Sequence, residues 1–263
     1  MTSILRTTLL YSLVPVVFTV VGAAAAVFIP GIARLRGAVL HLAAGVVFAV
    51  VAVELLPEIQ HRALVGDVVL GFALGIGTML LADRLIDRIR GGDDDSAPAG
   101  HASGDSEMQS TAHVATRSTV SASLFVAVSI DFLLDGLLLG VGFAAGARIG
   151  ILLALAEAAE QLSVGLALAG ELTAAGVARS RVVLIVSALG SLVFLTAVLG
   201  ATVLSRLTDG AMEIVLSFGA AALLYLVTNE LLREAHEERE SALSTVMFFA
   251  GFLAFLVVGM TLG

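Results

Sequence analysis

The chain has 263 residues, of which 59% are hydrophobic and 14% charged, and its mean hydropathy is +1.04. This composition is typical of a polytopic membrane protein and not of a soluble domain. The formal net charge of −8 argues against a nucleic-acid partner, and the absence of cysteine excludes disulfides and thiolate-bound metals.

Eight apolar segments follow one another along the chain, each long enough to cross a bilayer as a helix of about 20 residues. A closed barrel is excluded because the runs are longer than barrel strands and lack their alternation. We therefore predict an all-α, polytopic membrane protein with a single transmembrane domain over residues 1–263. Its spans are expected near residues 8–29, 37–57, 65–87, 119–144, 149–174, 180–205, 211–233 and 242–262.

The connections predict the orientation of the chain. The longest polar segment, residues 90–118, joins the third and fourth spans, and its composition cannot bury a core, so we expect a flexible loop. Ten of the 14 arginines lie in loops after odd-numbered spans, which favours a cytoplasmic position for these loops. The expected location is the cell membrane, multi-pass, with both termini extracytoplasmic. The first span is too long for a signal peptide and is expected to be retained.

The second and seventh spans end in similar motifs, at residues 53–58 (VELLPE) and 229–234 (NELLRE). Aligning their glutamates also brings the Gly-Phe at 71–72 near the Gly-Phe at 251–252. Spans one to three therefore resemble spans six to eight. Because the second copy crosses the membrane in the opposite direction, this pattern predicts a 3+2+3 inverted repeat. Chance is the alternative, since Glu-Leu-Leu is an easy pattern to meet at the end of an apolar helix.

Acidic residues interrupt spans four and five, which would lie between the repeats. Asp131 and Asp135 are four residues apart, and Glu157, Glu160 and Gln161 share one face of the next helix by the same spacing. A carboxylate at the centre of a span costs roughly 2.5 to 3.5 kcal/mol on insertion scales. Such residues usually face the bundle interior and hold an ion, a proton or one another.

Antiparallel packing of these two spans would bring the acidic faces together near mid-membrane. Like charges so close require a shared cation, or protons on some of the carboxyl groups. The donors would all be hard oxygens, which suit magnesium, manganese or calcium and tolerate zinc, iron or cobalt. The alternative is that the acids only hold the bundle together or line a water-filled vestibule.

At these residues the chain resembles the ZIP family of divalent-metal permeases, whose fourth span carries His-Asn-x-Pro-Glu-Gly and whose fifth carries His-Asp/Glu-x-Pro-Glu/His. By position, Asp131 stands at the first histidine and Asp135 at the glutamate. Glu157 and Glu160 match the two acidic positions of span five, and Gln161 follows them. Both histidines and both prolines of the family motifs are replaced, which leaves an oxygen-only site.

The resemblance implies a binuclear-capable metal site on these five residues. The loss of the span-five histidine and of a span-six acid favours a single ion here. The substrate implied is a divalent cation, with zinc, iron, manganese, cobalt and cadmium not distinguished. The lipid bilayer and the metal ion are the expected partners, and a homodimer is left open.

The sequence thus predicts an importer of divalent metal, and not an enzyme, since it has no phosphate-binding loop, nucleophile elbow or His-Glu-x-x-His motif. One alternative is a proton- or sodium-coupled carrier of an organic cation. Another is a non-transporting membrane sensor or partner protein that works through the acidic loop. Glu54 and Glu58 are expected as exposed charges near the outer end of span two, where they would attract cations.

Overall fold

The computed structural model describes residues 2–29, 31–62, 64–94, 122–231 and 242–262, and all regular secondary structure in these ranges is helical. Eight helical segments of the described residues are long and apolar enough to cross a membrane. The predicted all-α, polytopic membrane fold is therefore confirmed. Of the predicted flexible loop, residues 90–94 continue a helix, and residues 95–118 lie outside the described residues.

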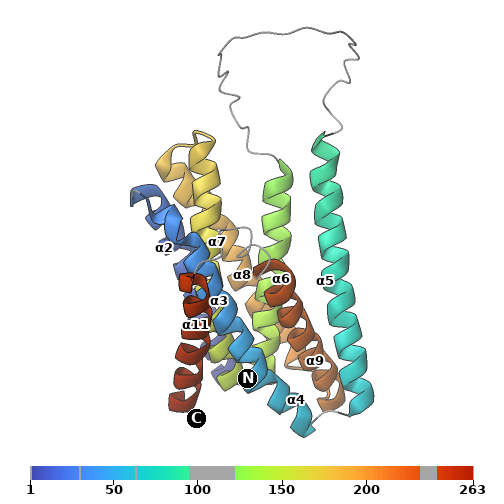
Figure 1. Cartoon of the computed structure of the whole chain (residues 1–263). Coiled ribbons are helices and arrows are strands. Elements are labelled where there is room, and N and C mark those ends of the chain that lie inside the picture. Colours follow the sequence, from blue (N-terminus) through green and yellow to red (C-terminus); the bar gives the residue numbers. More distant parts are fainter. Residues whose placement is uncertain (1, 30, 63, 95–121, 232–241, 263) are drawn as a thin grey trace, which may run out of the picture.

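Three of the crossings are built from more than one helical piece (Figure 1). The first consists of α1 (Thr2–Tyr11) and α2 (Leu13–Phe28). The second consists of α3 (Arg36–Val50), η2 (Val51–Leu55) and α4 (Leu56–Arg62), preceded by the short η1 (Ile32–Leu35). The seventh consists of α9 (Asp209–Tyr225) and η3 (Leu226–Leu231). The others are single helices: α5 (Val65–Asp94), α6 (Ala122–Ala145), α7 (Ala147–Ala174), α8 (Arg179–Leu204) and α11 (Ala242–Leu262).

The two ends of the bundle differ in their connections. α5 finishes and α6 begins at one end, which we call the loop end (top of Figure 1). α6 and α7 are joined at the opposite end, the turn end, through the single extended residue Gly146. Because this connection is so short, α6 and α7 are antiparallel neighbours, and their acidic residues lie at similar depths.

The outer surface of the bundle is apolar. Leu184, Leu199 and Phe249 are each more than half exposed. Such exposure would be unfavourable in water but is favourable against lipid tails, and a helix in lipid satisfies its own backbone hydrogen bonds. The surface therefore agrees with the apolar length of the helices in indicating a membrane setting.

Glycine allows neighbouring helices to approach closely. Gly22 of α2 and Gly165 of α7 each lie where a Cβ atom would overlap a backbone carbonyl of the other helix. Gly45 of α3 and Gly251 of α11 do the same across a second helix pair. α6 packs in this way on α8 and α5 on α9. Small residues are the usual means of packing helices in membranes, where no hydrophobic force drives association.

These four pairs join spans one and five, four and six, two and eight, and three and seven. The predicted repeat would relate span one to six, two to seven, three to eight and four to five. Under these exchanges the pair of spans one and five becomes the pair six and four, and the pair two and eight becomes the pair seven and three. An inverted repeat would produce this pattern. The repeat itself stays a prediction.

A π-helical turn interrupts each of the two spans that carry the matching Glu-Leu-Leu motifs. η2 contains Glu54, and η3 reaches Leu231. A π turn adds one residue to a helical turn and is common at functional sites, where it redirects the side chains that follow. The two spans thus share a backbone irregularity as well as a sequence motif.

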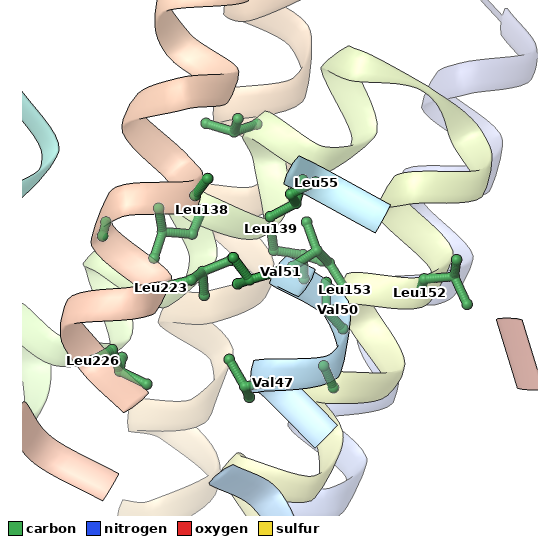
Figure 2. Packing of buried hydrophobic residues seen from close by; sticks show 14 of the residues in the cluster. Val47, Val50, Val51, Leu55, Leu138, Leu139, Leu152, Leu153, Leu223 and Leu226 are labelled. Atoms are coloured by element: carbon green, nitrogen blue, oxygen red, sulfur yellow. The ribbon is translucent and has the colours of Figure 1, made fainter. Parts of the chain in front are cut away.

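The largest apolar core lies between α3, η2, α6, α7, α9 and η3 (Figure 2). Leu138 and Leu139 of α6 and Leu152 and Leu153 of α7 belong to this core, together with side chains from the second and seventh spans. Leu139 and Leu152 are completely buried. Along α6 and α7 these four leucines lie on the turn-end side of the acidic residues, and the core also includes Phe132, between Asp131 and Asp135.

Candidate functional site

Four of the five predicted site residues are buried within the bundle. Asp135 and Gln161 are 0% exposed, Glu157 is 1% exposed and Glu160 is 4% exposed. Asp131 lies one helical turn from Asp135 toward the loop end and is half-buried. Asp131 is therefore the most accessible of the five residues.

Hydrogen bonds tie this set to α2. The Gln161 side-chain amide donates to Asp135 Oδ2 over 2.8 Å, which joins α7 to α6. The other end of the same amide, Oε1, accepts from the Thr19 hydroxyl at 3.0 Å. Thr19 is 0% exposed and also lies 2.9 Å from the Pro15 carbonyl oxygen of its own helix. Three spans thus meet at one amide group.

Glu157 has a buried carboxyl oxygen that is not satisfied by a hydrogen bond within the described residues. Its Oε2 atom is buried and has no hydrogen-bond partner among the described residues. Asp135 and Asp131 lie near it, and an ionised carboxylate on either would repel a negative charge on Glu157. Leaving a buried polar atom unsatisfied costs about 1 to 3 kcal/mol, and more for a charged group. A cation or a proton at Glu157 would remove this cost.

The described residues do not form a finished metal site. No group of three or more His, Cys, Asp or Glu side chains among them lies close enough to hold a metal ion. The Ser163 hydroxyl, two to three residues beyond Glu160 and Gln161, is a further buried oxygen with no hydrogen-bond partner in the described part of the chain. The five-residue metal site accordingly stays a prediction after the structure is considered.

An ion pair at the turn end was not expected from the sequence. Arg148, at the start of α7, donates to both carboxylate oxygens of Glu54 at 2.7 and 3.0 Å, and approaches the Gly259 carbonyl oxygen at 3.4 Å. Glu54 is only 7% exposed, so the expectation that it is an exposed helix-end charge was wrong. The π turn η2 places Glu54 inward, toward α7 and α11. The two partners are 94 residues apart, and no local pattern predicts their contact.

A second polar cluster joins α5 to the seventh span. The Tyr225 hydroxyl donates to Asp83, and the Asn229 amide donates to Asp83 Oδ2 at 3.3 Å and to the Tyr225 hydroxyl at 2.6 Å. Asn229 belongs to η3. Each π turn therefore contains a residue of a polar cluster, Glu54 in η2 and Asn229 in η3. The sequence alone did not predict either set of contacts.

A cavity of about 620 Å³ lies elsewhere, beside the ends of α2 and α7 and the beginnings of α3 and α8. Arg36, Glu171 and Arg179 are its charged lining residues. None of the five predicted site residues lines it. The cavity belongs to the loop end of the bundle and is separate from the buried acidic set.

Comparison with known protein families gives the identity of the chain. No curated protein matches the sequence. The family model described as "ZIP Zinc transporter" matches residues 90–259, which is well over half of the chain and includes α6, α7 and all five predicted site residues. Members of this family transport metal ions across membranes. The resemblance found in the sequence is confirmed, and the chain belongs to the ZIP zinc transporter family.

Proposed function

We propose that the protein imports a divalent metal cation, which binds in mid-membrane between α6 and α7. The ligands would be the carboxylates of Asp131, Asp135, Glu157 and Glu160, with Gln161 assisting. The observation that carries this proposal is the Glu157 carboxyl group, which is buried at 1% exposure, has an oxygen without a hydrogen-bond partner in the described residues, and lies near a second acidic side chain, Asp135. A divalent cation is the simplest group that satisfies all three conditions.

The donor chemistry bears on the choice of ion. Every proposed donor is an oxygen, and imidazole and thiolate are absent from the set. Oxygen ligands suit magnesium, calcium and manganese best, whereas softer ligands select zinc and cadmium more strongly. Among zinc, iron, manganese, cobalt and cadmium, we expect manganese to be carried at least as well as zinc, and cadmium least well. We expect one ion per site, because the span-five histidine and the span-six acid are replaced.

Burial of the site supports alternating access. Leu138, Leu139, Leu152 and Leu153 belong to the apolar core and lie between the acids and the turn end along α6 and α7, while Asp131 lies toward the loop end. We propose that ions reach the site from the turn end when the packing around these leucines opens. We propose that α2, α6, α7 and α8, which pack on one another, move together against α3, α5, α9 and α11.

The orientation of the protein in the membrane is proposed from the arginine distribution, which favours a cytoplasmic loop end. Single-cysteine labelling tests this orientation directly, because the native chain has no cysteine to remove. Arg206→Cys at the turn end should react with a membrane-impermeant maleimide added to intact cells, and Arg181→Cys at the loop end should react only after permeabilisation. Both side chains are exposed. The reverse labelling pattern would contradict the orientation.

Uptake into proteoliposomes tests the proposed function itself. Purified wild type is compared with Asp135→Asn and Glu157→Gln across manganese, zinc, iron, cobalt and cadmium. Glu171→Gln is the matched control, since Glu171 lies on the same helix as Glu157 but is exposed. We expect uptake in the wild type and the control, and loss of uptake in both site variants. Metal uptake that neither substitution affects, or uptake of an organic cation without metal, would overturn the proposal.

A further inference from the structure

The Gln161 amide is held at both ends, and its two ends are chemically different. The nitrogen end donates to Asp135 Oδ2, and the oxygen end accepts from Thr19. Thr19, Gln161 and Asp135 are all 0% exposed, so water does not substitute for these partners. With no cation bound, this is the favourable orientation, because an amide N–H group meets a carboxylate and an amide oxygen meets a hydroxyl.

In this orientation the Gln161 carbonyl oxygen points away from the carboxylate side of the site. Metal ions bind amide groups through oxygen and not through nitrogen. If Gln161 is to be a ligand beside Asp135, its amide must therefore turn by about 180° about its last side-chain torsion. That torsion is soft and roughly two-fold, so the turned amide fits the same space.

The Thr19 hydroxyl can serve both orientations. It has one hydrogen and two acceptors within reach, the Pro15 carbonyl oxygen at 2.9 Å and Gln161 Oε1 at 3.0 Å. While Gln161 presents its oxygen, the hydroxyl donates to Gln161. Once Gln161 presents its nitrogen, the hydroxyl donates to Pro15 and accepts from the amide. The turned Gln161 oxygen then faces Asp135 Oδ2, an arrangement that is favourable only with a cation between them.

We propose that Thr19 is a positioning residue that lets the Gln161 amide reverse when the site is loaded, so that its oxygen becomes a ligand of the divalent cation. The inference rests on the proposed function and adds to it a specific role for α2. Thr19 touches no ion and acts through Gln161. In the empty site the Gln161 amide nitrogen donates to Asp135. In the loaded site this nitrogen donates to the Thr19 hydroxyl, and the Gln161 oxygen faces the ion.

Removal of the hydroxyl affects the two orientations unequally. Thr19→Val leaves an amide oxygen without a donor in the empty site, and an N–H group without an acceptor in the loaded site. Buried N–H groups without acceptors are the rarer and costlier of the two in proteins. Because a hydrogen bond is lost in both states, only the difference between the two losses changes the affinity, and we expect KM for manganese uptake to rise about twofold to fivefold, with Vmax changed less than about twofold. Thr19→Ser should restore the wild-type KM.

Thr173→Val is the matched control, because the Thr173 hydroxyl on α7 donates only to its own helix, to the Ala169 carbonyl oxygen at 2.7 Å. Gln161→Glu provides a second readout: a carboxylate has no nitrogen end to reverse, so adding Thr19→Val to it should change KM far less than in the wild type. Calorimetric titration of the detergent-solubilised full chain with manganese chloride should reproduce these affinity differences without transport. Thr19→Ala replaces Thr19→Val should the latter fail to fold.

The results separate the two proposals. A wild type that neither binds nor carries any of the metals overturns the proposed function. A wild type that carries manganese and loses uptake in Asp135→Asn, but whose KM is unchanged in Thr19→Val, overturns the role of Thr19 alone. Equal effects of Thr19→Val in the wild-type and Gln161→Glu backgrounds would likewise reduce Thr19 to a packing residue.

Discussion

Two buried carboxyl groups of this protein, Glu54 and Glu157, lie at different positions along the bundle and differ in their hydrogen-bond partners. Near the turn end, Glu54 meets a guanidinium group of the chain itself, with both oxygens bonded to Arg148 at 2.7 and 3.0 Å. Between α6 and α7, Glu157 has a buried oxygen with no hydrogen-bond partner among the described residues, and Asp135 and Asp131 lie near it. The first carboxylate has its partner within the chain, whereas the second has an oxygen that our proposal assigns to a cation from outside.

The difference explains why burial alone does not identify a transport site. Glu54 is nearly as buried as Glu160, at 7% against 4% exposure. Its desolvation is offset by bidentate hydrogen bonding, a geometry that arginine provides particularly well. At the α6–α7 site the Glu157 Oε2 atom has no such offset among the described residues.

The largest expected effect comes from removing the unsatisfied charge. Glu157→Gln should lower metal uptake at least about 100-fold, because a neutral amide attracts a divalent cation far less than a carboxylate does. The same change should not lower the melting temperature of the metal-free protein, because a glutamine of the same shape replaces a buried carboxyl group that already has an oxygen without a hydrogen-bond partner among the described residues. Uptake and thermal unfolding in chelator measure the two effects. A variant that loses uptake and also unfolds at lower temperature would point to a structural role for Glu157.

Metal should stabilise the wild type through the acidic set. A ligand that binds only the folded state stabilises it by about 2.7 kcal/mol at 100 times its dissociation constant. We expect manganese to raise the unfolding temperature of the wild type and of Glu54→Gln/Arg148→Gln, but not of Asp135→Asn. Differential scanning fluorimetry in detergent measures this shift. Manganese stabilisation that persists in Asp135→Asn would place the bound ion elsewhere.

Arg148→Gln should remove the charged partner of both Glu54 carboxylate oxygens. Glu54 stays buried and loses its charged partner, which should reduce the free energy of unfolding by about 2 kcal/mol, a value below that of a fully buried pair because half of Arg148 is exposed. Chemical or thermal unfolding in detergent measures the loss. Arg206→Gln, an exposed arginine at the same end, is the control and should change stability by less than about 0.5 kcal/mol.

The smallest effect is expected when both partners are removed. Glu54→Gln/Arg148→Gln leaves no buried charge, so it should cost about 1 kcal/mol or less, clearly below the cost of Arg148→Gln alone. The four-variant cycle of stabilities checks this order. A double variant that is less stable than Arg148→Gln would show that the pair contributes through packing against Gly259 and not through charge.

The local features of the fold could be predicted because they are set by short stretches of chain. Apolar runs longer than about 18 residues adopt helix in lipid whatever surrounds them, since no other conformation satisfies the backbone there. The spacing of Asp131 and Asp135, and of Glu157 and Glu160, likewise follows from helical geometry alone. Their burial was expected because exposing four carboxylates to lipid would cost too much.

The contacts of the site could not be predicted because they join distant segments. Thr19 and Gln161 are 142 residues apart, and nothing around Thr19 in the sequence distinguishes it from the other hydroxyl residues that bond their own helix. Glu54 was misjudged for a related reason: the motif places it near a helix end, but the π turn η2 directs it into the bundle.

The class of fold, the position of the acidic residues within their spans and the family of the protein can therefore be read from the amino-acid sequence, because hydropathy, helical spacing and motif are properties of neighbouring residues. The arginine partner of Glu54 and the link from Asp135 through Gln161 to α2 follow from the three-dimensional packing. Those contacts depend on how the glycine faces of α2 and α7, and of α3 and α11, bring separate spans together. Close backbone approach sets the distances over which a hydrogen bond or an ion pair can form.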